Sequence, residues 1–235
     1  MSTAAQTSTA RGVVTPTFLV VAKAPVPGLA KTRIAATVGE ASAAEIAAAS
    51  LLDTLLTVGA VGWPVVVSMT GDLSRAARSE EIAAALEGAR LVEQRGVGLG
   101  ERLAHAHTDA DAGRGVVQVG MDTPQLTVAD YLQAGRLVAE GSRVIGPASD
   151  GGWWVLGLPD PDEAHGLMSV EMSQPDTGGL TERALGGELV HLRVVRDMDT
   201  WEDAMQLAAD TPLSNLARAV QHVQNNLPSA LEAHA

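Results

Sequence analysis

The chain has 235 residues, 46% of them hydrophobic, and carries a formal net charge of −12. This length suits one large α/β domain, and the acidic balance argues against general binding to nucleic acid or acidic membranes, because phosphate groups require a basic surface. The chain contains no cysteine, which excludes disulfides, thiolate metal sites and cysteine nucleophiles.

The two ends of the chain differ from its centre in composition. Residues 1–16 are small and polar and lack the apolar centre of a signal peptide, so we expect a disordered leader. We expect a single domain over residues 17–226, a loose tail over 227–235 and no apolar run that spans a membrane. A cytoplasmic location is the default expectation, and the oligomeric state is left open.

The first strong pattern is a strand followed by a stiff loop. The apolar run Phe18–Val21 is short, β-branched and aromatic, which predicts a buried strand. In the loop after it, Pro25 and Pro27 fix φ and remove two backbone donors, while Gly28 permits a tight turn. We therefore expect a rigid loop that can approach a ligand closely.

Three cations surround this loop, namely Lys23, Lys31 and Arg33. The two lysines are the only lysines in the chain. Lysine meets a phosphate as a compact point charge, whereas arginine imposes a planar fork. The loop is neither a Walker A sequence nor a GxGxxG motif, but its setting before a predicted helix favours a phosphate-binding role over ordinary solvated charges.

Further along the chain, apolar strands alternate with helical patterns. The order predicts a largely parallel sheet with helices on both faces. Residues 159–187, rich in proline, glycine and acidic residues, predict a long loop or lid with a short helix. The remaining predicted elements are helices at 39–58, 74–86, from 101, 128–140, 201–209 and 213–220, and strands at 65–69, 90–94, 116–120, 143–146 and 189–195.

Polar residues follow the predicted strands. In such sheets ligands collect at the carboxyl ends of the strands, so these side chains can converge although they are far apart in sequence. Carboxylates facing cations suit a metal-bound diphosphate, with Mg²⁺ or Mn²⁺ on the oxygens. Each aspartate can also simply cap the helix after it. The residues in question are Lys23, Asp72, Asp122, Asp150 and Asp199.

Other motifs carry weaker signals. The glycines of residues 96–100 run GxGxG, so the third is one position early for a dinucleotide fingerprint, although the loop can turn beside a nucleotide base or phosphate. His105 and His107 are two residues apart on a predicted helix and should point to different faces, which disfavours a shared metal. Of the adjacent Trp153 and Trp154, one should face the core.

The run KAPVPGLAKTR resembles the KxPxPGxxKTR signature of the bacterial DUF2064 family, whose members are often described as transferases of the nucleotide-diphospho-sugar type. The resemblance covers roughly residues 18–207 and continues in the family's order through QRGVGLGERL, GMDTPQL, GPASDGGWWVLGL and RDMDTWEDA. It implies a GT-A fold, related to molybdenum-cofactor cytidylyltransferases and phospholactate guanylyltransferases.

The resemblance also assigns roles to residues. It implies that Asp122 and Asp199 hold the catalytic metal, Mg²⁺ or Mn²⁺. The resemblance also implies that the loop around Gly28 is the phosphate-binding loop of the relatives. We further expect the glycine-rich loop at residues 96–100 to lie beside the nucleotide. The nucleotide-binding residues predicted in this way are Lys23, Pro27, Gly28, Lys31, Arg33, Gly98, Gly100 and Arg102.

The leading hypothesis is a metal-dependent transferase that uses a nucleotide-activated donor and a small-molecule acceptor, most simply a glycosyltransferase using a nucleotide diphosphate sugar. Asp122, Asp150 and Lys31 are the expected catalytic residues, with Asp150 orienting or deprotonating the acceptor hydroxyl. Gly151, Gly152 and Trp153 are expected to contact substrate beside Asp150.

Two alternatives remain at this level. GMDTP contains one aspartate and not the DxD of many glycosyltransferases, which leaves open a nucleotidyltransferase that uses CTP or GTP and releases pyrophosphate. The other alternative is a non-catalytic nucleotide-binding protein that has kept the fold.

Overall fold

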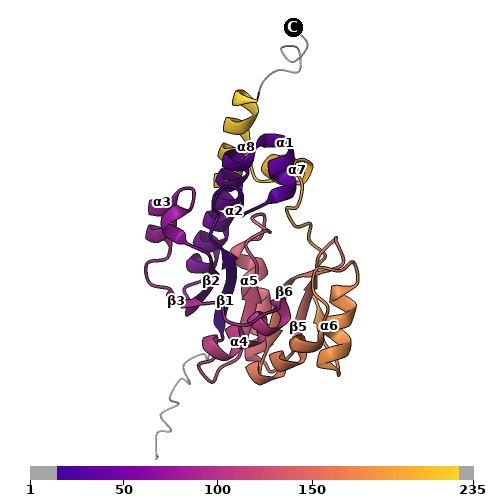
Figure 1. The fold of residues 1–235 in the computed structure, drawn as a ribbon. Coiled ribbons are helices and arrows are strands. Elements are labelled where there is room, and N and C mark those ends of the chain that lie inside the picture. Colours follow the sequence, from indigo (N-terminus) through magenta and orange to yellow (C-terminus); the bar gives the residue numbers. More distant parts are fainter. Residues whose placement is uncertain (1–14, 228–235) are drawn as a thin grey trace, which may run out of the picture.

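Strand β1 (Thr17–Lys23) is an inner strand of a seven-stranded sheet within residues 15–227, the part of the chain that the computed structural model describes (Figure 1). The strand order is β3-β2-β1-β4-β6-β5-β7. Residues 1–14 of the predicted leader and residues 228–235 of the predicted tail lie outside the described part.

The sheet is parallel except for β6, which runs antiparallel to both of its neighbours. The mostly parallel α/β fold predicted from the sequence is therefore confirmed. Central strands are nearly continuous apolar runs because helices cover both faces of the sheet. The strands after β1 are β2 (Val65–Thr70), β3 (Arg90–Glu93), β4 (Val116–Val119), β5 (Val144–Pro147), β6 (Trp153–Leu158) and β7 (Val190–His191).

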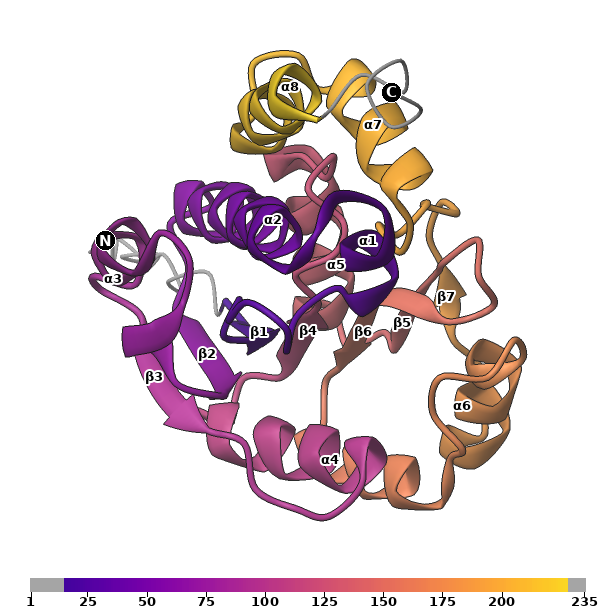
Figure 2. The same ribbon diagram turned by 45° about the horizontal axis from the view of Figure 1, so that its top comes forward.

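Alternation along β1 divides the core between the two faces. Phe18 and Val20 point to the face covered by helices α2 and α5, whereas Leu19 packs on the opposite face against α4 (Figure 2). The helices are α1 (Thr32–Val38), α2 (Glu40–Ala60), α3 (Ser79–Ala85), α4 (Leu99–Ala110), α5 (Val128–Ala139), α6 (Thr177–Leu185), α7 (Trp201–Asp210) and α8 (Asn215–Asn226), with 3₁₀ helices η1 (Leu73–Arg75) and η2 (Pro161–Ser169).

The chain reverses its direction of travel across the sheet at β1. It passes from β1 outward to β2 and β3, and then returns to place β4 on the other side of β1. The crevice outside the carboxyl ends of two such neighbouring strands is the usual ligand site in open α/β sheets. The fold thus directs attention to the segments that follow β1 and β4.

The local structure differs from the sequence predictions in three places. The predicted helix at 74–86 is split into η1 and α3, because Asp72 caps a separate short turn through the backbone N–H of Ser74. Helix α1, directly after the lysine loop, was not predicted. In the presumed lid, α6 corresponds to the predicted short helix, but η2 was not predicted; η2 packs on α4 through Leu167 and Leu103.

Helix α2 corrects the expectation about apolar runs. Its 21 residues reach a mean hydropathy of 1.4, so by length and composition α2 could cross a membrane. However, 72% of its most apolar window is buried within the fold. Its apolar character reflects packing between the sheet and α8, with Leu51 and Leu55 on the sheet side and Ile46 toward α7 and α8.

Candidate active site

The loop between β1 and α1 is a tightly turned segment at the carboxyl end of β1. The carbonyl of Val26 accepts hydrogen bonds from the backbone N–H groups of Leu29 and Ala30, and Gly28 adopts φ +76°. An added Cβ at Gly28 would lie 3.0 Å from the carboxylate of Glu40, so the turn leaves little room for a side chain. This compact turn positions the residues around Lys31.

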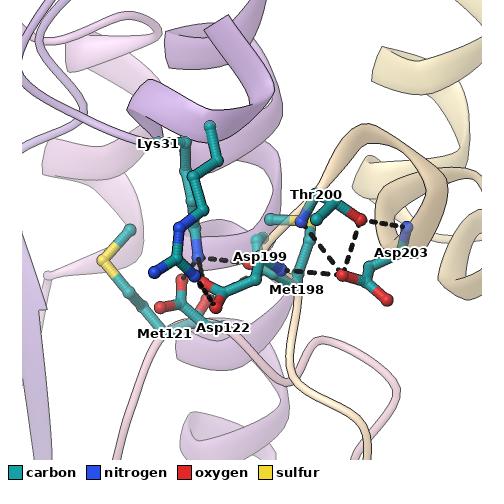
Figure 3. Close-up of polar contacts among 9 residues, drawn as sticks. Lys31, Met121, Asp122, Met198, Asp199, Thr200 and Asp203 are labelled. Carbon is teal, nitrogen blue, oxygen red and sulfur yellow. Dashed lines mark hydrogen bonds and ion pairs between the residues drawn. The ribbon is translucent and has the colours of Figure 1, made fainter. Parts of the chain in front are cut away.

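Lys31 is the N-cap residue of α1 and has a left-handed backbone, with φ 49°. Its side chain is 10% exposed, and its Nζ lies 2.9 Å from Oδ1 of Asp122 and 3.9 Å from Oδ1 of Asp199 (Figure 3). Lys31 Nζ also donates a hydrogen bond to the carbonyl of Met198. Lys31 therefore joins the segments that follow β4 and precede α7.

Those two segments are held together without Lys31 as well. The backbone N–H of Met198 donates to the carbonyl of Asp122 at 2.8 Å, and Ser50 of α2 donates to the carbonyl of Met121 at 2.6 Å. Thr200 and Asp203 form a capping box at the start of α7 (Figure 3). Asp199 is thereby fixed between a capped helix and the end of β4.

Arg33 completes the ionic contacts of this region. Its guanidinium lies 2.6 Å from Oδ2 of Asp199, and its side chain is 73% exposed. The third cation of the loop, Lys23, is exposed at the end of β1 and lines the same hollow. All three cations singled out in the sequence therefore lie at one site.

Three carboxylates gather beside these cations. Asp150, Asp197 and Asp199 each offer an oxygen within 4.8 Å of the other two. Burial, together with the charges of Asp150 and Asp199, raises the pKa of Asp197 to about 6. Crowded like charges of this kind favour either a shared proton or a bound cation. Oxygen ligands are those that Mg²⁺, Ca²⁺ and Mn²⁺ prefer.

The carboxylates lie where two cavities of about 600 and 610 Å³ meet. We call the first the α4 lobe, because Leu99, Arg102 and Leu103 of α4 line it, and the second the loop lobe, because residues 29–33 line it. The two lobes share Lys23, Met121, Asp122, Asp150, Ser173, Gln174 and Asp197.

The site therefore unites four of the five polar residues expected at strand ends. Lys23, Asp122, Asp150 and Asp199 all line the loop lobe. Asp72 does not line either lobe; its carboxylate accepts hydrogen bonds from the backbone N–H and the hydroxyl of Ser74 and caps η1. Asp72 therefore caps the helix that follows it, which was the alternative to a role in the site.

Two sets of predicted nucleotide-binding residues lie outside the lobes. Pro27 and Gly28 shape the turn and do not line either cavity, and the same is true of Gly98 and Gly100 in the glycine-rich loop. Gly100 is buried, and a Cβ there would collide with the Leu167 carbonyl oxygen of η2. Gly100 thus permits close helix packing, whereas Arg102 of the same motif does line the α4 lobe.

Of the residues expected to contact substrate, Asp150, Gly152 and Trp153 line the α4 lobe, whereas Gly151 does not line either lobe. Asp150 is exposed and accepts a hydrogen bond from the backbone N–H of Gly152 at 2.8 Å. Gly151 has φ +91° and lies against the Pro175 carbonyl, where no side chain fits. Trp153 lines the lobe and donates to Thr181, whereas Trp154 is buried and donates to the Arg193 carbonyl. One tryptophan of the pair faces the core, as predicted.

Asp197 was not among the predicted site residues. Its signal was present in the run Asp197-Met198-Asp199, because residues i and i+2 of an extended segment point to the same side. In the structure Asp122 pairs with Lys31, and Asp199 lies both beside Lys31 and within the trio of carboxylates.

The histidines are separated as predicted. His105 is half-buried and its Nδ1 lies 3.0 Å from the carbonyl of Arg95, whereas His107 is fully buried on the sheet side of α4. The Nε2 of His107 lies 2.9 Å from Oε1 of Gln118, and burial lowers the pKa of His107 to about 4. His107 is therefore neutral near pH 7.

Comparison with solved structures places this geometry in a known fold. A candidate nucleotide-diphospho-sugar transferase from Desulfovibrio desulfuricans G20 is 26% identical, with a TM-score of 0.75 over 89% of this chain and 94% of that chain. Rv0371c of Mycobacterium tuberculosis H37Rv, in complex with manganese, is 16% identical, with a TM-score of 0.50 over 82% of this chain and 97% of that chain.

A 4-diphosphocytidyl-2C-methyl-D-erythritol synthase from Anaerococcus prevotii DSM 20548 shares the fold at 13% identity, with a TM-score of 0.53 over 89% of this chain and 99% of that chain. No curated protein matches the chain. A family model described as "Uncharacterized protein conserved in bacteria (DUF2064)" matches residues 54–174, just over half of the chain. The sequence motifs and this match agree, and the chain belongs to the DUF2064 family.

Proposed function

We propose that this protein is a metal-dependent transferase that acts on a nucleotide-activated donor, and that it transfers a glycosyl group from a nucleotide diphosphate sugar. The observation that carries the proposal is the trio Asp150, Asp197 and Asp199 beside two lysines and an arginine. The likeness to a candidate nucleotide-diphospho-sugar transferase supports it.

The carboxylate trio fits a divalent metal such as Mg²⁺ or Mn²⁺. Three hard oxygen ligands converge, and the pKa of Asp197 is raised first by burial and then by the charges of Asp150 and Asp199, which a cation would compensate. Such a metal supplies charge neutralisation for the diphosphate leaving group. The manganese complex of Rv0371c, a protein of the same fold, is consistent with this choice.

The cations of the loop lobe bind the donor's phosphates in this scheme. Lys31 is paired with Asp122 in the structure, so it can bind a phosphate oxygen only by exchanging or sharing that partner. Arg33 is 73% exposed and can reach an incoming ligand. Asp122, predicted from the sequence as a metal ligand, becomes available as Lys31 turns toward the donor.

In this scheme Asp197 and Asp199 hold the metal, and Asp150, the most exposed member of the trio, is the proposed base. Its carboxylate is exposed at the junction of the two lobes, and the backbone N–H of Gly152 fixes one of its oxygens. From this place it accepts the proton of the acceptor hydroxyl as that oxygen attacks the sugar carbon and the nucleoside diphosphate leaves. No covalent enzyme intermediate is needed.

Nucleotidyl transfer is the second candidate. Three cations around one short loop also suit a triphosphate, and the fold is shared with a 4-diphosphocytidyl-2C-methyl-D-erythritol synthase. In this reaction an oxygen of a phosphorylated acceptor attacks the α-phosphate of CTP or GTP and pyrophosphate leaves. The released product separates the candidates: nucleoside diphosphate in the first, pyrophosphate in the second.

Thermal stability against a panel of nucleotides and nucleotide sugars, with Mn²⁺, Mg²⁺ or a chelator, tests the proposal. A ligand at a hundred times its Kd should stabilise the fold by about 2.7 kcal/mol. Metal-dependent stabilisation by one nucleotide diphosphate sugar, lost in Asp197→Asn, supports glycosyl transfer. A response to CTP or GTP alone favours nucleotidyl transfer.

The control variant is Asp210→Asn, which removes an exposed aspartate of α7 that does not line either lobe. It should respond to the ligands as the unmodified protein does. If no nucleotide shifts the transition with either metal, the proposal is wrong and a non-catalytic role for the fold becomes the better account.

A further inference from the structure

Arg102 is a charged side chain of the α4 lobe that has no partner within residues 15–227. Its Nε is buried and makes no hydrogen bond there. The neighbouring acid, Glu101, is engaged elsewhere, because its carboxylate accepts the backbone N–H of Val97 at 2.8 Å. A buried guanidinium nitrogen without a partner is costly, which points to a ligand that completes it.

The backbone that carries Arg102 is held firmly. The first turn of α4 packs on η2, where Gly100 meets the Leu167 carbonyl so closely that no side chain fits. Leu103, next in the chain, is buried against Leu156 and Leu167. The position of Arg102 is therefore set by packing, and its charge faces a preformed cavity.

Gln118 of β4 supplies a second polar group to the same lobe. It is only 3% exposed, and its Oε1 accepts a hydrogen bond from Nε2 of the buried His107 at 2.9 Å. This contact leaves the Gln118 amide N–H groups to the cavity that Gln118 lines. The other glutamine of the lobe differs, since Gln94 donates to the carbonyls of Ala22 and Ser68.

The surroundings of these donors are apolar. Leu99, Leu103, Trp153 and Met172 line the α4 lobe around Arg102 and Gln118. Apolar walls with a few fixed donors suit an organic ligand that carries one anionic group, and they strengthen the charge interaction by excluding water. The carboxylates at the junction with the loop lobe would repel such an anion and direct it toward Arg102.

We propose that the α4 lobe binds the anionic group of the acceptor, a carboxylate or a phosphate monoester, with Arg102 as its charge partner and Gln118 as a second hydrogen-bond donor. His107 is a positioning residue that fixes the Gln118 amide from behind. The identification of the ligand as the acceptor rests on the proposed transferase function, whereas the anion site itself does not.

Isothermal titration with phenyl phosphate and with benzoate, in the presence of EDTA, tests this site on the full-length protein. We expect one of the two anions to bind, which distinguishes a phosphate from a carboxylate ligand. Arg102→Met should raise the Kd at least tenfold, and Gln118→Glu, which places a negative charge against the anion, should do the same. If Gln118→Glu does not fold, Arg102→Met alone decides.

The matched control is Arg95→Met. Arg95 belongs to the same connection between β3 and α4, but it pairs with Asp109 and does not line either lobe. Its Kd should stay within twofold of the unmodified protein. Binding that is unchanged in Arg102→Met, the absence of binding by both anions, or Arg102-dependent binding of uncharged cytidine or guanosine in their place would overturn the proposal.

The role of His107 has its own readout. His107→Leu removes the hydrogen bond to Gln118 and should raise the Kd for the anion severalfold, whereas His107→Gln keeps a donor and should restore most of the affinity. Equal affinity in both variants would contradict the positioning role. Because EDTA removes the metal, anion binding without any metal-dependent nucleotide response would preserve this site and refute only the transferase proposal.

Discussion

The two lobes of the cleft differ in whether their cationic side chains have acidic partners. In the loop lobe Lys31 pairs with Asp122 and Arg33 pairs with Asp199, so the charges of these two cations are already compensated. In the α4 lobe Arg102 has no such partner among the described residues. A ligand must therefore exchange ion pairs in the loop lobe, whereas in the α4 lobe it supplies the missing charge.

Asp199→Asn should produce the largest change, because Asp199 contacts two of the three cations of the loop lobe, Lys31 and Arg33, and belongs to the carboxylate trio. We expect donor turnover to fall by about a thousandfold, roughly 4 kcal/mol of transition-state stabilisation. The measurement is kcat/KM for the donor, with Asp210→Asn as the control. Turnover within threefold of the unmodified protein would remove Asp199 from the mechanism.

The buried His107 of α4 should make the free energy of unfolding depend on pH. Burial lowers the pKa of His107 from 6.5 to about 4, so above pH 6.5 His107 is neutral in both the folded and the unfolded chain and does not reduce the free energy of unfolding. As the pH falls from 6.5 to 4, His107 binds a proton in the unfolded chain but not in the folded protein. The free energy of unfolding therefore drops by up to about 3 kcal/mol. Urea unfolding at several pH values should show this slope.

The slope should disappear in His107→Gln and persist in His105→Gln, which changes a half-buried histidine two residues away on the same helix. A slope of equal size in His107→Gln would show that other groups cause the acid sensitivity of the fold.

Lys31→Met tests the contribution of the Lys31 charge to donor binding in the loop lobe. In the unmodified protein the ammonium of Lys31, whose side chain is 10% exposed, should bind a phosphate of the donor. Its loss in Lys31→Met should raise the donor's Kd about tenfold, which is within the range for a charge-assisted hydrogen bond. Lys31→Arg should not restore the affinity, because a planar fork cannot replace the compact charge that reaches Asp122, Asp199 and the Met198 carbonyl. Full recovery in Lys31→Arg would contradict this requirement.

An ion pair outside both lobes gives the smallest expected effect. Burial opposes ionisation of Asp130, but hydrogen bonds from Arg193 and Thr127 outweigh it and lower the pKa to about 2. This stabilisation is present above pH 3.8 and is lost as the pH falls through 2. Asp130→Asn should reduce the free energy of unfolding at pH 7 by about 1 kcal/mol and leave donor binding unchanged. Altered donor binding would show that the helix α5 side couples to the cleft.

The fold was accessible to sequence analysis because its strands are short apolar runs separated by helical patterns. Phe18–Val21 and the polar residues after the strands were enough to predict a mostly parallel sheet and a site at its carboxyl edge. Helix α1 was missed because Lys31 begins it without a side-chain cap. In residues 159–187 the short helix α6 was predicted, but the proline and glycine content concealed η2.

The site was predicted less completely than the fold. Strand-end position identifies Lys23, Asp122, Asp150 and Asp199, but it does not identify Asp197, which approaches them only through the path of the chain between Val195 and α7. The glycines at 98 and 100 show the opposite problem, since a motif resembling a nucleotide loop includes a packing contact with η2. Pairwise contacts of this kind are not encoded in local pattern.

Direct measurement of Mn²⁺ binding tests the central claim, that the carboxylates where the lobes meet hold a catalytic metal. In an electron paramagnetic resonance titration we predict that the signal of free Mn²⁺ falls until about one ion is bound per chain. Asp197→Asn should weaken binding at least tenfold, and Asp210→Asn should not. An undiminished signal of free Mn²⁺, or equal binding in Asp197→Asn, would contradict the account.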